Sequence, residues 1–175
     1  TIAQQKGDGS WETLTQGLSG AGFKSLAPGD DGTLWGCDIN NNVWEFDTQT
    51  ATWSKVALAP STSSVAKLSM GNASNIWALS GDGVLFQRIQ DGDTTSWKIP
   101  DQAIGTGAIK DFCVAPDGTI MVLGGDNKIY RGLKTQAGYS FNQFCTPADM
   151  VGMPAVSIAA GSKSFIAFST PSNEV

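Results

Sequence analysis

Short apolar runs alternate with polar turn residues along most of the chain. The runs LWGCD at 34–38 and VWEF at 43–46 are separated by the asparagines at 40–42. Runs of this length, rich in aromatic and β-branched residues and bounded by Gly, Asp, Asn and Ser, are typical of β-strands joined by tight turns. No window of useful length shows the apolar spacing of an amphipathic helix. The pattern therefore predicts an all-β protein.

The strand pattern recurs with a period of just over forty residues. An aromatic residue opens an apolar segment at Trp11, Trp53, Trp97 and Phe141, with spacings of 42, 44 and 44 residues. Each interval contains about four strand-like runs. A repeat of this length with four strands is the signature of a β-propeller blade.

The first strand of each repeat carries a regular register. Large apolar residues occupy one position, and small residues follow directly after most of them. Small side chains suit strands that crowd around a central axis. The large residues are Leu26, Leu68, Phe112 and Ile158, and the residues that follow them are Ala27, Ser69, Cys113 and Ala159.

The last repeat lacks its third and fourth strands, and the N-terminal segment resembles what is missing. We therefore expect one domain over 1–175, a small propeller of four blades with four antiparallel strands each. The N- and C-terminal strands would pair in one blade and close the ring, which removes free sheet edges. Two chains forming an eight-bladed ring is the alternative, so we expect a monomer or a homodimer. The repeats run at about 11–52, 53–96, 97–140, and 141–175 plus 1–10.

The sequence of the first repeat resembles that of a known family. The segment FKSLAPGDDGTLWG at 23–36, followed by NVW at 42–44, is similar to the tectonin repeat. The second repeat keeps Ile76 and Trp77, the third keeps Asp117 and Gly118, and the fourth departs most. Tectonin-like proteins are β-propellers, often with six blades, and many are lectins of innate defence that bind methylated glycans or lipopolysaccharide. The resemblance implies a lectin that recognises surface glycans, such as methylated or N-acetylated sugars, through several equivalent sites; the residues alone imply only a multivalent binding scaffold.

Composition narrows the classes of partner. Hydrophobic residues make up 41% of the 175 residues and charged residues 15%, as in a globular protein. The net charge is −5 and no basic run is present, so we expect no nucleic-acid partner. No apolar stretch approaches the roughly 20 residues of a membrane helix, so we expect no membrane insertion. The N-terminus does not resemble a signal peptide, which suggests a cytoplasmic protein or one secreted without a visible signal.

Catalytic chemistry has few candidates in this sequence. Histidine is absent, which removes the usual general base and a common metal ligand. The Asp residues lie in turns of different repeats, and no two of them stand out as a pair of catalytic carboxylates. We therefore expect no enzymatic activity and no cofactor. The segment 38–42 matches the first half of a calcium loop, but the glycine that should come next and the distal glutamate are missing, so we expect no metal. Cys37, Cys113 and Cys145 are expected to be packing residues.

Sugar binding requires an aromatic face for a pyranose ring and planar polar groups for its hydroxyls. The turns beside the aromatic residues of each repeat provide both. The alternative is that the Asn and Asp residues only form turns, and that Trp35 and Trp77 pack between blades. A protein–protein interaction propeller without sugar binding is the alternative function. The predicted ligand-binding residues are Asp38, Asn40, Asn41, Asn42, Trp44, Asp82, Asp126, Asn127, Tyr130 and Arg131.

Overall fold

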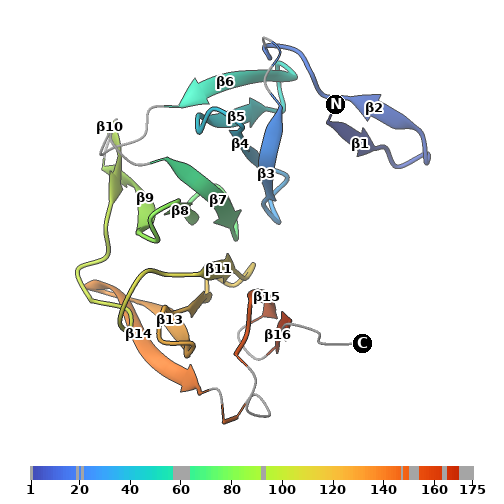
Figure 1. The fold of residues 1–175 in the computed structure, drawn as a ribbon. Coiled ribbons are helices and arrows are strands. Elements are labelled where there is room, and N and C mark those ends of the chain that lie inside the picture. Colours follow the sequence, from blue (N-terminus) through green and yellow to red (C-terminus); the bar gives the residue numbers. More distant parts are fainter. Residues whose placement is uncertain are drawn as a thin grey trace.

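The computed structural model describes residues 2–18, 20, 22–56, 64–91, 94–146, 148–149, 154–162 and 165–169. Every regular element in these ranges is a β-strand, and no helix in them could span a membrane. Three four-stranded antiparallel sheets follow one another around a common centre, each built from four consecutive strands (Figure 1). The predicted all-β propeller fold is confirmed.

The strands of the three sheets fall into equivalent sets, which we call blades 1, 2 and 3. Blade 1 contains β3 (Phe23–Pro28), β4 (Leu34–Asp38), β5 (Val43–Asp47) and β6 (Thr52–Val56). Blade 2 contains β7 (Val65–Met70), β8 (Ile76–Ser80), β9 (Leu85–Asp91) and β10 (Thr94–Lys98). Blade 3 contains β11 (Asp111–Val114), β12 (Ile120–Leu123), β13 (Ile129–Thr135) and β14 (Gly138–Cys145).

The first strands of the blades lie innermost and next to one another. β3 contacts β7, β7 contacts β11, and β11 contacts β15 (Ser157–Ser162). The register predicted from the sequence is present, because Leu26, Leu68, Phe112 and Ile158 lie opposite equivalent positions of the second strand. Backbone hydrogen bonds to side chains link the blades: Ser25 Oγ accepts from the Leu68 N–H at 3.2 Å, and Ser69 Oγ from the Val114 N–H at 2.9 Å.

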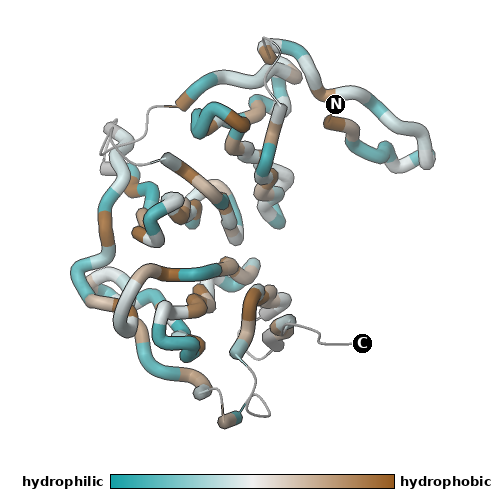
Figure 2. The backbone as a smooth tube through the Cα atoms, in the orientation of Figure 1, coloured by the Kyte–Doolittle hydropathy of each residue, from teal (hydrophilic) through white to brown (hydrophobic). Residues whose placement is uncertain are grey.

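The core lies between the blades. Trp35 packs with Leu68 and Met70 of blade 2, and Trp77 packs with Phe112 and Phe141 of blade 3. The two tryptophans are fully buried, which confirms that they pack between blades. Figure 2 shows apolar and hydrophilic residues interspersed along the strands, as expected where each strand is buried on one side and exposed on the other.

The terminal strands differ from the predicted arrangement. β1 (Ala3–Gln5) pairs with β2 (Trp11–Thr13), and β15 pairs with β16 (Phe165–Ser169), in two separate two-stranded sheets. The four terminal strands therefore do not form the single closing blade that the sequence predicted. The reason is the curvature of the arc. β15 contacts β11 and β12 of blade 3, and the segment after β2 joins blade 1 through the Trp53 N–H, which donates to the Gln16 carbonyl. The arc does not turn far enough to bring the two hairpins together (Figure 1).

Candidate functional site

The residues predicted to bind ligand lie on one rim of the blades. They occupy the turns between the second and third strands: β4–β5, β8–β9 and β12–β13. Because these turns are equivalent in each blade, they face the same side of the propeller. The structure thus brings the predicted residues to one rim, but in three separate turns.

Asp38 organises the turn of blade 1. Its carboxylate is buried and accepts hydrogen bonds from the backbone N–H groups of Asn40 and Asn42, both at 2.8 Å. It also accepts from Asn42 Nδ2 at 2.8 Å and from Trp44 Nε1 at 2.9 Å. Burial alone would raise the pKa of Asp38, but these hydrogen bonds together hold it below its usual value. The Asp38 carboxylate is therefore used within the turn.

Blade 3 repeats this arrangement with other side chains. Tyr130 donates to Asp126 at 2.6 Å, and burial together with this bond raises the pKa of Tyr130 to about 12. Lys110 donates to Asn127 as Lys24 donates to Asn41 in blade 1. Asn41 and Asn127 have φ of 66° and 64°, a left-handed backbone that asparagine tolerates.

The remaining predicted residues have different surroundings. Arg131 lies with its guanidinium carbon 5.4 Å from the ring centroid of Phe144 on the outer strand. Asn40 and Asp82 are exposed, and Asp82 lies between Gly81 and Gly83 in the turn of blade 2. Most of the predicted side chains thus support the turns in which they lie.

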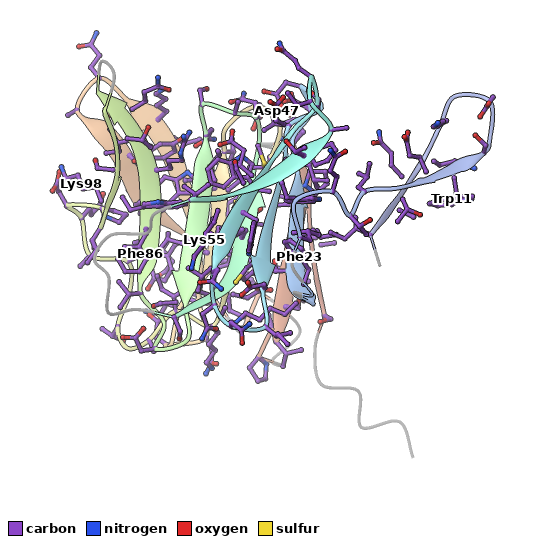
Figure 3. All side chains as sticks on the ribbon, turned by 90° about the horizontal axis from the view of Figure 1, so that it is seen from above. Trp11, Phe23, Asp47, Lys55, Phe86 and Lys98 are labelled. Atoms are coloured by element: carbon purple, nitrogen blue, oxygen red, sulfur yellow. The ribbon has the colours of Figure 1, made fainter. Side chains whose placement is uncertain are left out.

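A polar pocket of about 450 Å³ lies at the opposite rim, between blades 1 and 2. We call it the blade 1–2 pocket. Its walls come from the β3–β4 turn, the end of β5 and the β5–β6 turn, with single residues from β6 and the β7–β8 turn. Figure 3 shows Asp47 at this rim and Phe23 toward the other. The lining residues are Asp31, Gly32, Thr33, Glu45, Phe46, Asp47, Thr48, Gln49, Ser54 and Ala73.

Two carboxylates in the wall are fixed by hydrogen bonds. Asp31 accepts from the Ala73 N–H at 2.8 Å, across the blade boundary, and from the Thr33 N–H at 3.1 Å. Asp47 accepts from Thr50 Oγ1 and from the Gln49 N–H, both at 2.8 Å. These bonds lower the pKa of both carboxyl groups, so both are ionised at neutral pH.

Two buried nitrogen donors lie beside the pocket wall, on Trp35 and Arg88, which do not themselves line the pocket. Trp35 lies directly opposite Glu45, and Glu45 opposite Ser54, so the three side chains share one face of blade 1. The guanidinium carbon of Arg88 lies 4.7 Å from the ring centroid of Trp35. Among the described residues, Trp35 Nε1 and Arg88 Nε are the buried side-chain nitrogens without a hydrogen-bond partner. Such unpaired donors are uncommon and costly in native structures.

The interface between blades 2 and 3 shows how the equivalent indole N–H is satisfied. Trp77 holds the position of Trp35, and Trp77 Nε1 donates to Asn75 Oδ1 at 2.7 Å. Tyr139 lies over Trp77 with ring centroids 4.9 Å apart and donates to the same Asn75 oxygen at 2.9 Å. In blade 1 the residue two before the tryptophan is Thr33 rather than asparagine. The place of Tyr139 over the indole is taken by the Arg88 guanidinium.

The two indoles make similar edge-to-face contacts with the outer strand of the next blade. Trp35 meets Trp97 at 6.4 Å and 72°, and Trp77 meets Phe141 at 6.3 Å and 84°. We infer that Trp35 Nε1 faces Thr33, which lines the pocket, as Trp77 Nε1 faces Asn75. The sequence analysis missed this site, although the signal was present in the repeat alignment as Thr33 against Asn75.

The thiols of Cys37 and Cys113 are protonated at neutral pH. Burial raises the pKa of Cys37 and Cys113 to about 11, and Cys37 Sγ donates to the Val65 carbonyl at 3.1 Å. Within the described residues, no group of three or more Cys, Asp or Glu side chains is arranged to hold a metal ion.

Comparison with known proteins gives the fold class. No protein family matches the sequence, and no curated protein matches it. Solved propellers match the structure. Virginiamycin B lyase from Staphylococcus aureus has a TM-score of 0.63 at 17% identity over 97% of this chain and 56% of its own. A putative gluconolactonase has 0.62 at 15% over 95% and 62%, and human WBSCR16 has 0.64 at 11% over 87% and 46%. The chain therefore spans about half the length of these propellers.

These neighbours correct one expectation from the sequence. Absence of enzymatic activity was expected because histidine is missing and no carboxylate pair stands out. Solved structures of the same fold include a lyase and a putative gluconolactonase. The expectation of no enzymatic activity was therefore wrong, because the propeller fold also serves enzymes. At these identities the likeness shows the fold alone. The resemblance to tectonin repeats stays a prediction.

Proposed function

We propose that the protein binds carbohydrate in the blade 1–2 pocket. The observation that carries this proposal is the pair of unpaired donors, Trp35 Nε1 and Arg88 Nε, beside a wall of carboxylate, amide and hydroxyl groups. A sugar hydroxyl both donates and accepts hydrogen bonds, so it needs both kinds of group nearby. The pocket offers acceptors in its wall, and the two unpaired donors lie buried beside that wall.

The charges of the pocket favour an uncharged sugar over a phosphate or a nucleic acid. Asp31 and Asp47 are ionised at neutral pH, and Glu45 lies in the same wall. A carboxylate that is already fixed by backbone donors loses little freedom when it accepts a further bond from a ligand hydroxyl. A volume of about 450 Å³ is in the range of small-molecule sites.

The resemblance of 23–36 to the tectonin repeat supports the same class of ligand, and with it a role as a lectin in defence. Part of that segment, Asp31 to Thr33, lines the pocket. The Asn-rich turns at the other rim are the competing site. Their aromatic partners, Trp44 and Tyr130, already donate to carboxylates of the same turns.

A glycan array followed by titration calorimetry with the best sugar tests the proposal. Arg88→Met removes the donors over Trp35 while keeping an apolar stem. Arg131→Met makes the same change on the strand that follows the rim turn of blade 3. We expect Arg88→Met to weaken binding by about tenfold or more and Arg131→Met to leave it unchanged.

Three outcomes contradict the proposal in different ways. A blank array from folded protein would remove carbohydrate as the ligand and favour a protein partner. Loss of binding in Arg131→Met with retention in Arg88→Met would move the site to the Asn-rich turns. If both variants bind the sugar as tightly as the natural protein does, the site lies elsewhere. Because similar propellers include enzymes, the bound sugar is also checked for chemical change by mass spectrometry.

A further inference from the structure

The two ends of the arc present complementary, uncovered sheet edges. Among the described strands, β1 pairs on one side with β2 and β16 pairs on one side with β15. In each complete blade the second strand pairs with the third. β15 and β16 are the inner two strands of a blade, and β1 and β2 correspond to the outer two. A β16 edge placed beside a β1 edge therefore completes a four-stranded blade.

Apolar side chains at these ends are exposed at positions that are buried elsewhere. Trp11 is 68% exposed, whereas the residues that open the outer strand in blades 1 to 3, Trp53, Trp97 and Phe141, are 4%, 7% and 3% exposed. Leu26 is 42% exposed, whereas Leu68, Phe112 and Ile158 are 2%, 0% and 3% exposed. Trp11 and Leu26 lie at the N-terminal end of the arc, where, among the described strands, β1 and β2 lack the inner two strands of their blade. A pocket of about 660 Å³ lies at this end, lined in part by Phe23 and Leu26.

The side chains on the two edges also fit in size. With Trp11 in the register of Trp53 and Trp97, Ala3 of β1 comes to lie opposite Phe168 of β16. The equivalent pairs in blades 1 to 3 combine a small or medium residue on the second strand with an aromatic residue on the third. At the proposed junction the order is reversed, with the aromatic residue on β16 and alanine on β1. The equivalent pairs are Gly36 with Trp44, Ala78 with Phe86, and Val122 with Tyr130.

The residue before the large apolar position of the first strand accepts a hydrogen bond from the next blade at two of the three described boundaries; between blades 2 and 3 this position is Lys67, which donates to Asp111 instead. Ser25 Oγ accepts from the Leu68 N–H between blades 1 and 2, and Asp111 Oδ2 accepts from the Ile158 N–H at 2.9 Å between blade 3 and β15. Ser157 holds the equivalent position on β15, one residue before Ile158. Its hydroxyl would accept from the Leu26 N–H of the next blade.

We infer that two copies of this chain close one ring, with β16 of each copy paired to β1 of the other. A chain cannot supply both edges to itself, because its two hairpins lie apart at the ends of the arc (Figure 1). The size of the ring also fits. One chain covers 56% of virginiamycin B lyase, so two copies supply about one propeller of that size. The resulting assembly is a symmetric ring in which two of the blades are shared between copies. This inference does not depend on the proposed ligand.

Solution mass and a matched pair of variants test the inference. We expect light scattering after size exclusion to give twice 18.3 kDa for the natural chain. Trp11→Glu should give the monomer mass with unchanged circular dichroism, because Trp11 makes few contacts within its own chain. Ile99→Glu places the same charge on another exposed apolar residue, away from both ends, and should remain a dimer.

Cross-linking separates closure by two copies from closure within one chain. In the inferred register Gln4 lies opposite Ala167, so the Gln4→Cys, Ala167→Cys double variant is treated with a short bis-maleimide. The product should migrate as a covalent dimer, and neither single variant should yield it efficiently. A cross-linked monomer would overturn the inference in favour of the self-closed ring. A monomer mass for the natural chain would overturn it in favour of ring completion by other segments or partners.

Discussion

Arg88 lies over Trp35 where, one blade further on, Tyr139 lies over Trp77. The tyrosine completes a hydrogen-bonded group with Asn75, whereas the Nε atom of the arginine remains unpaired beside an unpaired indole N–H. Two interfaces built from the same repeat thus differ in whether their polar atoms are satisfied. We attribute the difference to function, because an unpaired buried donor reduces the free energy of unfolding unless a ligand or water meets it.

Exchanging the residues that lie two positions before Trp35 and Trp77 tests this comparison. Thr33→Asn places beside Trp35 the partner that Trp77 already has, so it should increase the free energy of unfolding by about 1 kcal/mol and weaken sugar binding. The reverse change, Asn75→Thr, removes an oxygen that accepts hydrogen bonds from both Trp77 and Tyr139. It should lower the free energy of unfolding by roughly 1–3 kcal/mol. Urea denaturation measures both. A destabilising Thr33→Asn would show that Trp35 Nε1 does not face that position.

Asp38 should make the stability of the fold depend on pH. Its folded pKa is depressed, so its contribution is present above the unfolded pKa of 3.8 and is lost as pH falls through the folded pKa. At pH 7, Asp38→Asn should lower the free energy of unfolding by roughly 1.5–3 kcal/mol, because charge-assisted hydrogen bonds are replaced.

The difference between the natural protein and Asp38→Asn should shrink as pH falls below 3.8, which denaturation at several pH values would show. Asp30→Asn, an exposed turn residue, is the control and should change stability by less than about 0.5 kcal/mol. A difference that stays constant down to the lowest pH would mean that the ionised carboxylate is not what stabilises the turn.

Asp111 should hold the last hairpin on the arc. Its carboxylate is mostly buried, accepts from the Ile158 N–H at 2.9 Å and pairs with Lys67 Nζ at 2.6 Å. Asp111→Ala should therefore raise amide hydrogen exchange in β15 and β16 well before it does so in blades 1 and 2. Lys67→Met keeps the bond to Ile158 and should have a smaller effect on that hairpin. Uniform acceleration across all blades in Asp111→Ala would contradict this role.

Much of the fold could be predicted from the sequence because the blade is a local unit. The alternation of runs such as 34–38 and 43–46, and the register shared by Leu26 and Leu68, depend on neighbours close in the chain. Ring closure is different. The same strands and the same register serve rings of several sizes, and the angle between blades depends on how side chains such as Trp35 and Trp77 fill the space between sheets. Sequence periodicity does not report that angle.

The candidate site was harder to predict for a related reason. Asn and Asp residues in turns attract attention as ligand-binding groups, yet Asp38 and Asp126 are used by their own turns. The unpaired donors beside the blade 1–2 pocket coincide with differences between repeats, Thr33 against Asn75 and Arg88 against Gly132. A search for features that all repeats share does not detect such differences.

The proposed function requires a sugar to bind beside the unpaired donors of the blade 1–2 pocket. The most direct test is the indole N–H region of a ¹H–¹⁵N spectrum during titration with the best glycan from the array. The chain has six tryptophans, and Trp35→Phe and Trp77→Phe identify the two relevant signals. We predict a saturable shift of the Trp35 signal, with the Trp77 signal unchanged. A shift of Trp44 alone, with Trp35 unchanged, would contradict the account and place the ligand at the Asn-rich turns.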